Sequence, residues 1–438
     1  MGSFVPTTSS ERQQMLKTIG VGSVEELFRD VPQEMRIDGY LDLPSGKSEM
    51  ETLESVSALA EKNHVFRTCL RGAGSYRHYI PAAVKAIVNR EEFVTAYTPY
   101  QAEISQGILQ AIFEYQTMLC ELTGMDVSNA CVYDGGTAAA ESITMCRDRK
   151  RTKAYVSATT DPQVIEVMKT YCFGSDVELT VVPQKDGRTD PEALRSLLGQ
   201  DAACFYVQQP NFYGLLEEAE LLGEITHAAG AKYVMGVNPI SLAILKTPAE
   251  CGADVAVGEG QPLGLDTAFG GPYLGFMTAS SAMMRKLPGR IVGQTVDTEG
   301  EIGYVLTLSA REQHIRREKA SSNICSNEQL CAFTAAVYLS AMGEKGLRQA
   351  ATLCTSKAHY FAQQLEEKLG WKRVHPGEFF HEFVTECPDT EKALAALAKR
   401  DILGGLPVEG GILWCVTEVA TKERLDEAVA ILQEVSCG

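Results

Sequence analysis

The sequence predicts a doubly wound, mainly parallel α/β domain followed by a small C-terminal α+β domain. Between about residues 153 and 280, short and nearly continuous apolar runs alternate with stretches of helical periodicity. This pattern is typical of a sheet that helices cover on both faces. In the tail, glycines separate short strand-like runs, as expected of turns. The expected strands of the large sheet are residues 153–157, 178–183, 203–208, 232–237, 254–257 and 273–278.

The order of the elements divides the chain into three parts. Residues 1–60 are irregular, with two short amphipathic stretches, and we expect an arm that covers another subunit. Residues 61–330 hold the large domain, which includes a one-sided helix over residues 105–123 that ends at Gly124. Residues 331–438 hold further helices and the small domain. In such a fold, binding sites lie beyond the carboxyl ends of the parallel strands.

Composition and charge exclude several classes of protein. The 438 residues are 45% hydrophobic and 22% charged, near the globular average, and no apolar run reaches the roughly 18–20 residues of a membrane helix. The formal net charge of −17 repels phosphate backbones, so nucleic acid is not an expected partner. No basic-then-apolar signal segment opens the chain. Thirteen cysteines without a CxxC pair predict buried, reduced thiols, no metal site and a cytoplasmic location.

Four segments are dense in polar residues or glycine where a core would hold neither: residues 71–79, 95–107, 133–141 and 311–323. Six motifs follow one another along the chain, namely TAYTPYQAEISQG, FEYQTM, DGGTAAAE, FGGPYLGF, PGRIVGQT and REQHIRREKASSNIC. Together they resemble the P-protein of the glycine cleavage system. More narrowly, they resemble its N-terminal half, which some bacteria encode as a separate subunit.

This resemblance implies fold type I of the pyridoxal-phosphate-dependent transferases and the activity of an aminomethyl-transferring glycine dehydrogenase (decarboxylating). The complete enzyme would decarboxylate glycine and transfer the aminomethyl group to the lipoyl arm of the H carrier protein. In this fold, a lysine near a strand end forms a Schiff base with the cofactor. An aspartate on a neighbouring strand pairs with the pyridinium nitrogen, so that the ring draws electrons from the substrate.

Neither residue is present where the fold would place it. The strand expected to carry the aspartate reads YVMGVNP, with Gly236 and Val237 and no acid, so no negative charge holds a ring nitrogen protonated. Gln261 stands at or beside the lysine position, and glutamine cannot form an imine. Lys246 and Lys286 are the nearest alternatives, each beside an expected helix and expected in solvent. We therefore expect a partner subunit to bind the pyridoxal 5'-phosphate covalently.

Asp134, at the expected position of the cofactor's phosphate, also indicates that this chain does not bind the cofactor. It precedes GGTAAAE, where a phosphate-binding loop would present backbone N–H groups at the start of a helix. A carboxylate is a good N-cap at that position, but it repels a dianionic phosphate. We interpret the loop as a retained feature of the fold whose ligand has been lost.

The run Tyr97-Thr98-Pro99-Tyr100-Gln101 is the first candidate for lining an active site across a subunit interface. Proline fixes the backbone and favours an extended residue before it. The two tyrosines present rigid aromatic faces with polar tips, which suit a cofactor ring or a small zwitterion. The alternative is a structural turn with packed tyrosines.

Arg77 and His78 are further candidates for the same site. Arginine is the usual partner of a carboxylate such as that of glycine, and histidine can orient or move a proton near neutral pH. The alternatives are a solvent-facing arginine and a structural histidine. Ser321, Ser322 and Asn323 are expected to cap the following helix and to donate to the phosphate of the partner's cofactor. The alternative there is a basic helix face with internal ion pairs.

The leading hypothesis is a subunit that is inactive alone and shapes the active site of a lysine-bearing second P-protein subunit, with two copies of each subunit (α2β2). The lipoyl H carrier protein and glycine are the other expected partners, and no membrane or nucleic acid is expected. One alternative is a purely structural or regulatory subunit that touches no substrate. The other is an autonomous pyridoxal-phosphate enzyme, such as a cysteine desulfurase or a decarboxylase.

Overall fold

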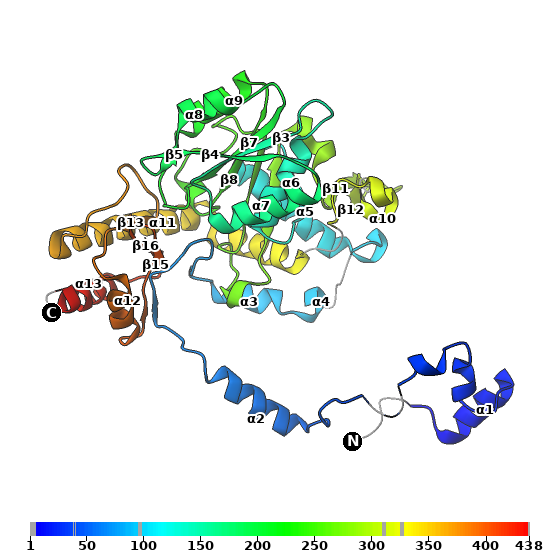
Figure 1. Cartoon of the computed structure of the whole chain (residues 1–438). Coiled ribbons are helices and arrows are strands. Elements are labelled where there is room, and N and C mark those ends of the chain that lie inside the picture. The colour runs from blue at the N-terminus through cyan, green and yellow to red at the C-terminus, as the bar shows by residue number, and fades with distance from the viewer. Residues whose placement is uncertain are drawn as a thin grey trace. The chain divides into compact units, whose positions relative to one another are not determined.

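The computed structural model of the chain describes residues 6–37, 39, 41–94, 99–308, 312–324 and 328–436 (Figure 1). These residues belong to two compact units, Met1–Val65 and Phe66–Gly438. The expected boundaries of the three parts, at residues 60 and 330, stay predictions. Among the described residues, no helix combines the length and the apolar character that crossing a membrane requires.

The described part of the first unit consists of helices that bury nothing of their own. The elements are α1 (Ser9–Ile19), α2 (Glu49–Ala60) and two 3-10 turns, Glu25–Phe28 and Gln33–Met35, and none of them contains a buried residue. Both α-helices begin with a capping box, because the side chain of Thr8 or Ser48 exchanges hydrogen bonds with a glutamate three residues later. Local capping, not a core, therefore accounts for these helices.

The core of the second unit is a sheet with the strand order β2-β10-β9-β8-β7-β3-β4. Neighbouring strands from β9 to β4 are parallel, whereas β10 runs antiparallel to both β9 and β2. This mainly parallel sheet confirms the expected fold class. The strand expected at residues 273–278 begins two residues later and runs in the opposite direction. The strands are β2 (Val127–Ser128), β3 (Lys153–Ser157), β4 (Leu179–Val182), β7 (Ala202–Gln209), β8 (Lys232–Val237), β9 (Val255–Glu259) and β10 (Gly275–Ala279).

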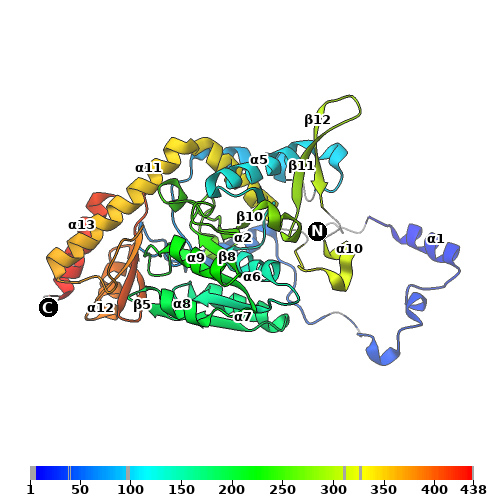
Figure 2. The same ribbon diagram turned by 90° about the horizontal axis from the view of Figure 1, so that it is seen from above.

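Helices cover both faces of this sheet (Figures 1 and 2). On β7, Phe205 and Val207 point into one hydrophobic cluster with residues of α5, α9 and α11, while Cys204 and Tyr206 point into the other with residues of α6 and α7. Successive side chains of a strand face opposite sides, so a nearly continuous apolar run fills both clusters at once. The helices are α5 (Gln106–Thr123), α6 (Gly135–Cys146), α7 (Pro162–Gly174), α8 (Pro191–Leu197), α9 (Ala219–Ala228) and α11 (Gln329–Leu369).

The long helix α11 leads from the large sheet to the small C-terminal domain. It contains 41 residues and is kinked at Gly343, where φ is 60°. The small domain has the antiparallel order β13-β16-β15 and also draws in β1, which pairs in parallel with β14. Its elements are β1 (Thr68–Cys69), β13 (Glu382–Thr385), α12 (Thr390–Ala398), β14 (Ile402–Leu403), β15 (Leu406–Val408), β16 (Gly411–Cys415) and α13 (Lys422–Ser436).

Shorter elements connect these layers. A hairpin of β11 (Ile291–Val296) and β12 (Ile302–Thr307) contributes Val292 and Tyr304 to a small cluster with Leu109 of α5. The remaining helices and strands are α3 (Ala82–Val88), α4 (Glu91–Val94), β5 (Gln184–Lys185), β6 (Arg188–Thr189) and α10 (Gln313–Arg316). The remaining 3-10 turns among the described residues are Ala102–Ile104, Ser241–Ala243, Ala268–Gly270, Ser281–Lys286 and Arg317–Lys319.

Candidate functional site

A cavity of about 520 Å³ opens beyond the carboxyl ends of the parallel strands, where sites of this fold are expected. Gln208 of β7, Asn238 after β8 and Glu259 of β9 line it. Asp134 and Asp161, at the starts of α6 and α7, form part of its wall. The cavity is therefore lined by three carboxyl groups, and among the described residues no lysine lines it.

The start of α6 is occupied by carboxylates of the chain itself. Asp134 is the N-cap, as expected, and its Oδ1 accepts from the N–H of Thr137 at 2.7 Å. Glu259 Oε2 accepts from the N–H of Gly135 at 2.9 Å, and its Oε1 accepts from the N–H groups of Gln261 and Leu274. Burial raises the pKa of Glu259 to about 7. Two acids thus hold the N–H groups that would otherwise face a phosphate.

Gln261 lies two residues beyond β9 and is fully engaged in structure. Its side chain is buried, with 1% of the residue exposed. The Oε1 atom accepts from the N–H of Tyr76 at 2.9 Å, and Nε2 donates to the carbonyls of Tyr76 and Leu265 at 2.9 and 2.8 Å. Gln261 therefore fastens the segment around Tyr76 to the end of the sheet.

The two lysines nearest in sequence face elsewhere. Lys246 is exposed and donates to Glu220 at 2.7 Å. Lys286 is also exposed, and it donates to the carbonyl of Arg147 at 3.1 Å. The expectation that both are solvated is confirmed.

The end of β8 offers no acid to the cavity. A Cβ at Gly236 would overlap the hydroxyl of Tyr206 on β7, so the missing side chain makes room for that ring. Val237, the last residue of β8, and Asn238 line the cavity. Asp161 is the nearest carboxyl from the α7 side, but its Oδ1 caps that helix by accepting from the N–H of Gln163 at 2.8 Å.

The run from Tyr97 to Gln101 is described only from Pro99 onwards, and Tyr97 and Thr98 lie outside the described residues. The hydroxyl of Tyr100 accepts from Arg290 Nη2 at 2.7 Å, and the guanidinium carbon lies 4.7 Å from the centre of the Tyr100 ring. Arg290 is buried, with 2% of the residue exposed, whereas Tyr100 is half exposed. None of Pro99, Tyr100 and Gln101 lines the cavity of its own chain. Their expected role in a partner's site stays a prediction.

The other candidates contact their own chain. Arg77 is exposed and donates to the carbonyl of Arg67 at 3.2 Å. His78 is buried against Glu418, with Nδ1 and Oε2 2.7 Å apart. Neither Arg77 nor His78 lines the cavity, and their expected role in a partner's site stays a prediction.

The expected helix cap at residues 321–323 is wrong. Helix α11 begins at Gln329, with Glu328 as its N-cap, well beyond Ser321 and Asn323, which are exposed. The hydroxyl of Ser322 instead donates to Glu141 of α6 at 3.0 Å. Whether these residues donate to a partner's phosphate stays a prediction.

Sequence reasoning missed Glu259 and Tyr206. Glu259 appears in VAVGEGQ as one acid among small residues, and nothing local indicates that it turns back onto the start of α6. Tyr206 reads as one more apolar strand residue. The only local signal was the pair of glycines, Gly236 and Gly258, in neighbouring strands that otherwise have bulky residues.

Comparisons with known proteins place these features in context. The family model "Glycine cleavage system P-protein" matches residues 2–432. Proteins named probable glycine dehydrogenase (decarboxylating) subunit 1 from Desulfitobacterium hafniense and Moorella thermoacetica are 47% and 48% identical, and each match covers 99% of this chain and 100% and 99% of the relative.

Solved structures agree with these relatives. The crystal structure of an inhibitor-bound glycine decarboxylase (P-protein) of the glycine cleavage system is 42% identical, with a TM-score of 0.92 over 99% of this chain and 100% of that one. A sphingosine-1-phosphate lyase from Burkholderia pseudomallei is 13% identical, with a TM-score of 0.67 over 92% and 94% of the two chains, and it shares the fold alone. The expected pyridoxal-phosphate fold type I is confirmed.

Proposed function

This chain belongs to the glycine cleavage system P-protein family, in its subunit 1 form, and we propose that it completes the active site of a lysine-bearing partner without holding the cofactor itself. The enzyme of this family is the glycine dehydrogenase (decarboxylating). Pyridoxal phosphate supplies the electron sink for loss of the glycine carboxylate. The residues around the cavity bear on which of the two chains can hold pyridoxal phosphate.

The single observation that carries the proposal is the state of the cavity beyond β7, β8 and β9. Gln261, two residues beyond β9, does not line this cavity, and its amide makes three hydrogen bonds to backbone groups. The start of α6 is capped by Asp134 and Glu259, and an added dianion would meet both carboxylates. A cofactor that needs a primary amine, a phosphate cradle and an acid beside its ring nitrogen does not fit these residues.

The contribution to the partner's site is proposed for the segment Tyr97–Gln101. Its described end is anchored, because Tyr100 receives a hydrogen bond from buried Arg290 and lies against its guanidinium. An anchored aromatic segment loses little entropy when it meets a ring or a zwitterion. Glycine and the lipoyl arm of the H carrier protein would enter beside it. Two copies of each subunit are the proposed stoichiometry.

The test of the cofactor assignment compares this chain alone, the partner alone and their complex. Each is mixed with pyridoxal phosphate, and absorbance is read near ~420 nm, the signature of the cofactor joined to a lysine. Borohydride then fixes the cofactor, and peptide mapping locates it. We expect the label only on the partner. A labelled lysine in this chain would overturn the proposal.

A second test addresses substrate contact. In the reconstituted complex, Tyr97→Phe and Gln101→Leu are expected to lower glycine-dependent CO2 release by about 10-fold or more, because each removes a polar group from the proposed site. The control is Gln110→Leu, at an exposed position on α5. Unchanged turnover in both variants, with the complex still assembled, would favour the purely structural or regulatory subunit.

A further inference from the structure

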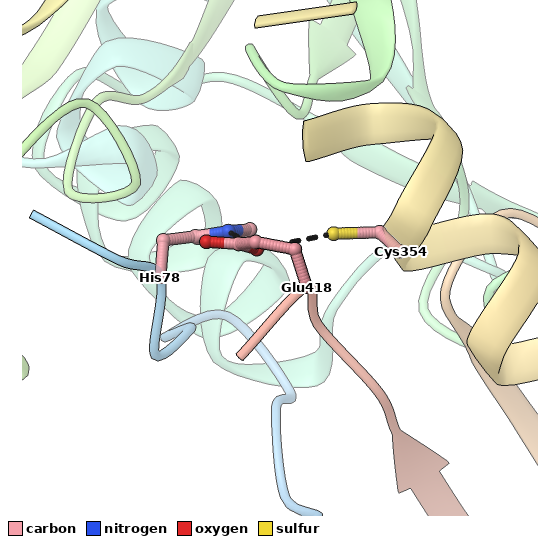
Figure 3. A group of neighbouring side chains, drawn as sticks. All are labelled: His78, Cys354 and Glu418. Carbon is pink, nitrogen blue, oxygen red and sulfur yellow. Dashed lines mark hydrogen bonds and ion pairs between the residues drawn. The ribbon is translucent and has the colours of Figure 1, made fainter. Parts of the chain in front are cut away.

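Three segments that are far apart in sequence bring potential metal ligands together at one point. His78 follows β1, Cys354 lies on α11, and Glu418 lies between β16 and α13 (Figure 3). The His78 Nδ1 and Glu418 Oε2 atoms are 2.7 Å apart, and Cys354 Sγ is 3.4 Å from the same Oε2 atom. One ligand atom from each residue lies within 4.8 Å of the other two. The sequence could not indicate this site, because zinc motifs are recognised by close spacing along the chain.

The cluster is enclosed and its carboxylate is held in place. The side chains of His78 and Glu418 are 2% and 11% exposed, and Cys354 is fully buried. The N–H of Tyr79 donates to Glu418 Oε1 at 2.6 Å, and Lys357 Nζ donates to the Glu418 backbone carbonyl at 2.5 Å. Oε2 therefore faces the histidine and the thiol. Such outer hydrogen bonds orient the ligands of protein metal sites.

Buried polar atoms around the cluster have no hydrogen-bond partner among the described residues. They are His78 Nε2, the hydroxyl of Tyr338, and both ring nitrogens of His381. Each of these residues is more than nine-tenths buried. The carboxylate of Glu418 acts electrostatically on both Tyr338 and His381. Buried polar groups in native proteins are nearly always paired, so these atoms indicate bound water beside the cluster; the three ligand atoms proposed below are not among them.

We propose that His78, Cys354 and Glu418 bind one Zn²⁺ ion through Nδ1, Sγ and Oε2. Zinc takes nitrogen, sulfur and carboxylate ligands in tetrahedral geometry at about 2.0–2.3 Å, which separates N from O by about 3.3 Å and S from N or O by about 3.6 Å. The S–O separation of 3.4 Å already fits. The N–O pair at 2.7 Å has to open by about 0.6 Å. Because Glu418 is held in place, a rotation of the His78 ring is the proposed source of this shift.

The protons balance in a simple way. With neutral His78, the ring proton moves from Nδ1 to Nε2, so that the Nδ1 lone pair faces the ion. The thiol of Cys354 gives its proton to solvent as the Zn–S bond forms, because a coordinating thiol is deprotonated. Glu418 binds as the carboxylate. One proton is released for each ion, and a water molecule completes the four ligands.

The three ligands together predict zinc, and with water as the fourth ligand the site has the open form rather than the closed four-ligand form of most structural zinc sites. A thiolate with an imidazole disfavours magnesium and calcium, which take oxygen ligands. The ion would join the segment after β1 to α11 and to the start of the last helix, and so fix the small domain on the large one. The inference is independent of which chain holds the cofactor. In this proposal His78 is a ligand of the ion and not a residue that lines the partner's active site.

The test uses the full chain in complex with its partner. After chelator treatment and gel filtration, the complex is loaded with Zn²⁺ and its metal content is measured, and in parallel it is titrated with Co²⁺. We expect about one bound ion per copy of this chain and a thiolate-to-cobalt charge-transfer band. Cys354→Ser and Glu418→Gln are expected to weaken Zn²⁺ binding by at least about 100-fold, because loss of an outer-shell partner alone costs about 10–100-fold.

The matched control is Cys120→Ser, which removes a half-buried thiol on α5 and should leave the bound ion and the cobalt band unchanged. A wild-type complex that takes up less than about one tenth of an ion, or a cobalt complex without the thiolate band, overturns the proposal. So does a Cys354→Ser protein that binds Zn²⁺ as tightly as wild type. The cobalt spectrum needs no variant, so the test stands even where a substitution prevents folding.

Discussion

Replacing Gln261 with leucine should destabilise the second unit, because the amide is a buried structural link. The change keeps the volume but removes the partners of the Tyr76 N–H, the Tyr76 carbonyl and the Leu265 carbonyl. A buried group left without a partner costs about 1–3 kcal/mol. Tyr76 is buried, whereas Leu265 is half-buried, so the carbonyl of Leu265 reaches water more easily than that of Tyr76. After allowing for the extra apolar burial, we expect a loss of about 2–5 kcal/mol.

The melting temperature converts this loss into a measurement. For roughly 370 cooperative residues the unfolding entropy is about 0.8 kcal/mol/K, so 3 kcal/mol lowers the melting temperature by about 4 °C. Scanning calorimetry of the wild type and of Gln261→Leu measures the difference. Gln110→Leu, on the exposed face of α5, is the control and should shift it by less than about 1 °C. A Gln261→Leu protein that melts within about 1 °C of wild type would refute the structural role of this amide.

Substitutions at three further positions test other contacts of the second unit, beginning with Glu382, which accepts from the N–H of Ala73 and the hydroxyl of Tyr76. Burial raises the pKa of Glu382 to about 7, so protonated Glu382 stabilises the fold fully below about pH 4.5, and this stabilisation is lost as the pH rises to about 7. The melting temperature of wild type should therefore fall relative to that of Glu382→Gln between pH 5 and 8. A difference between the two melting temperatures that stays constant over this range would contradict the reasoning. Gly236→Ala should cost about 1–3 kcal/mol by overlap with the hydroxyl of Tyr206, and Tyr206→Phe in the same chain should recover part of that loss in chemical denaturation. Tyr100→Phe removes the hydrogen bond from Arg290. A hydrogen bond to a charged group contributes about 1.5–3 kcal/mol, so we expect the turnover of the complex to fall by about 10-fold. Turnover equal to wild type would show that the Arg290–Tyr100 contact is dispensable.

Local patterns were enough to locate the sheet, because each strand residue contributes to one of two cores. The alternation of Phe205 and Val207 with Cys204 and Tyr206 predicts a strand buried on both faces. The direction of β10 was not predictable in the same way, because an apolar run reads alike in either direction. The cap of α6 by Asp134 was also predictable, since an N-cap acts within one helical turn.

The parts of the site that sequence reasoning missed depend on long-range pairing. Glu259 reaches Gly135 across 124 positions, and Arg290 reaches Tyr100 across 190. Periodicity records which face a residue occupies, not which distant group it meets. The same limit explains Ser322, which reads as a helix cap in the sequence and binds Glu141 in the structure. The expected absence of a Schiff-base lysine and of its partner aspartate rests on the family resemblance at single positions, and it stays a prediction.

The pairing of β1 with β14 has a consequence for synthesis on the ribosome. Thr68 and Cys69 leave the exit tunnel early, yet their strand partners are Ile402 and Leu403, more than 330 residues later. At translation rates of about 5–20 residues per second, the early strand waits roughly 20–70 s with its backbone groups unpaired. During that interval an unpaired strand edge is open to other chains. Nascent chains stalled before residue 402 should therefore recruit chaperones that released full-length chains do not.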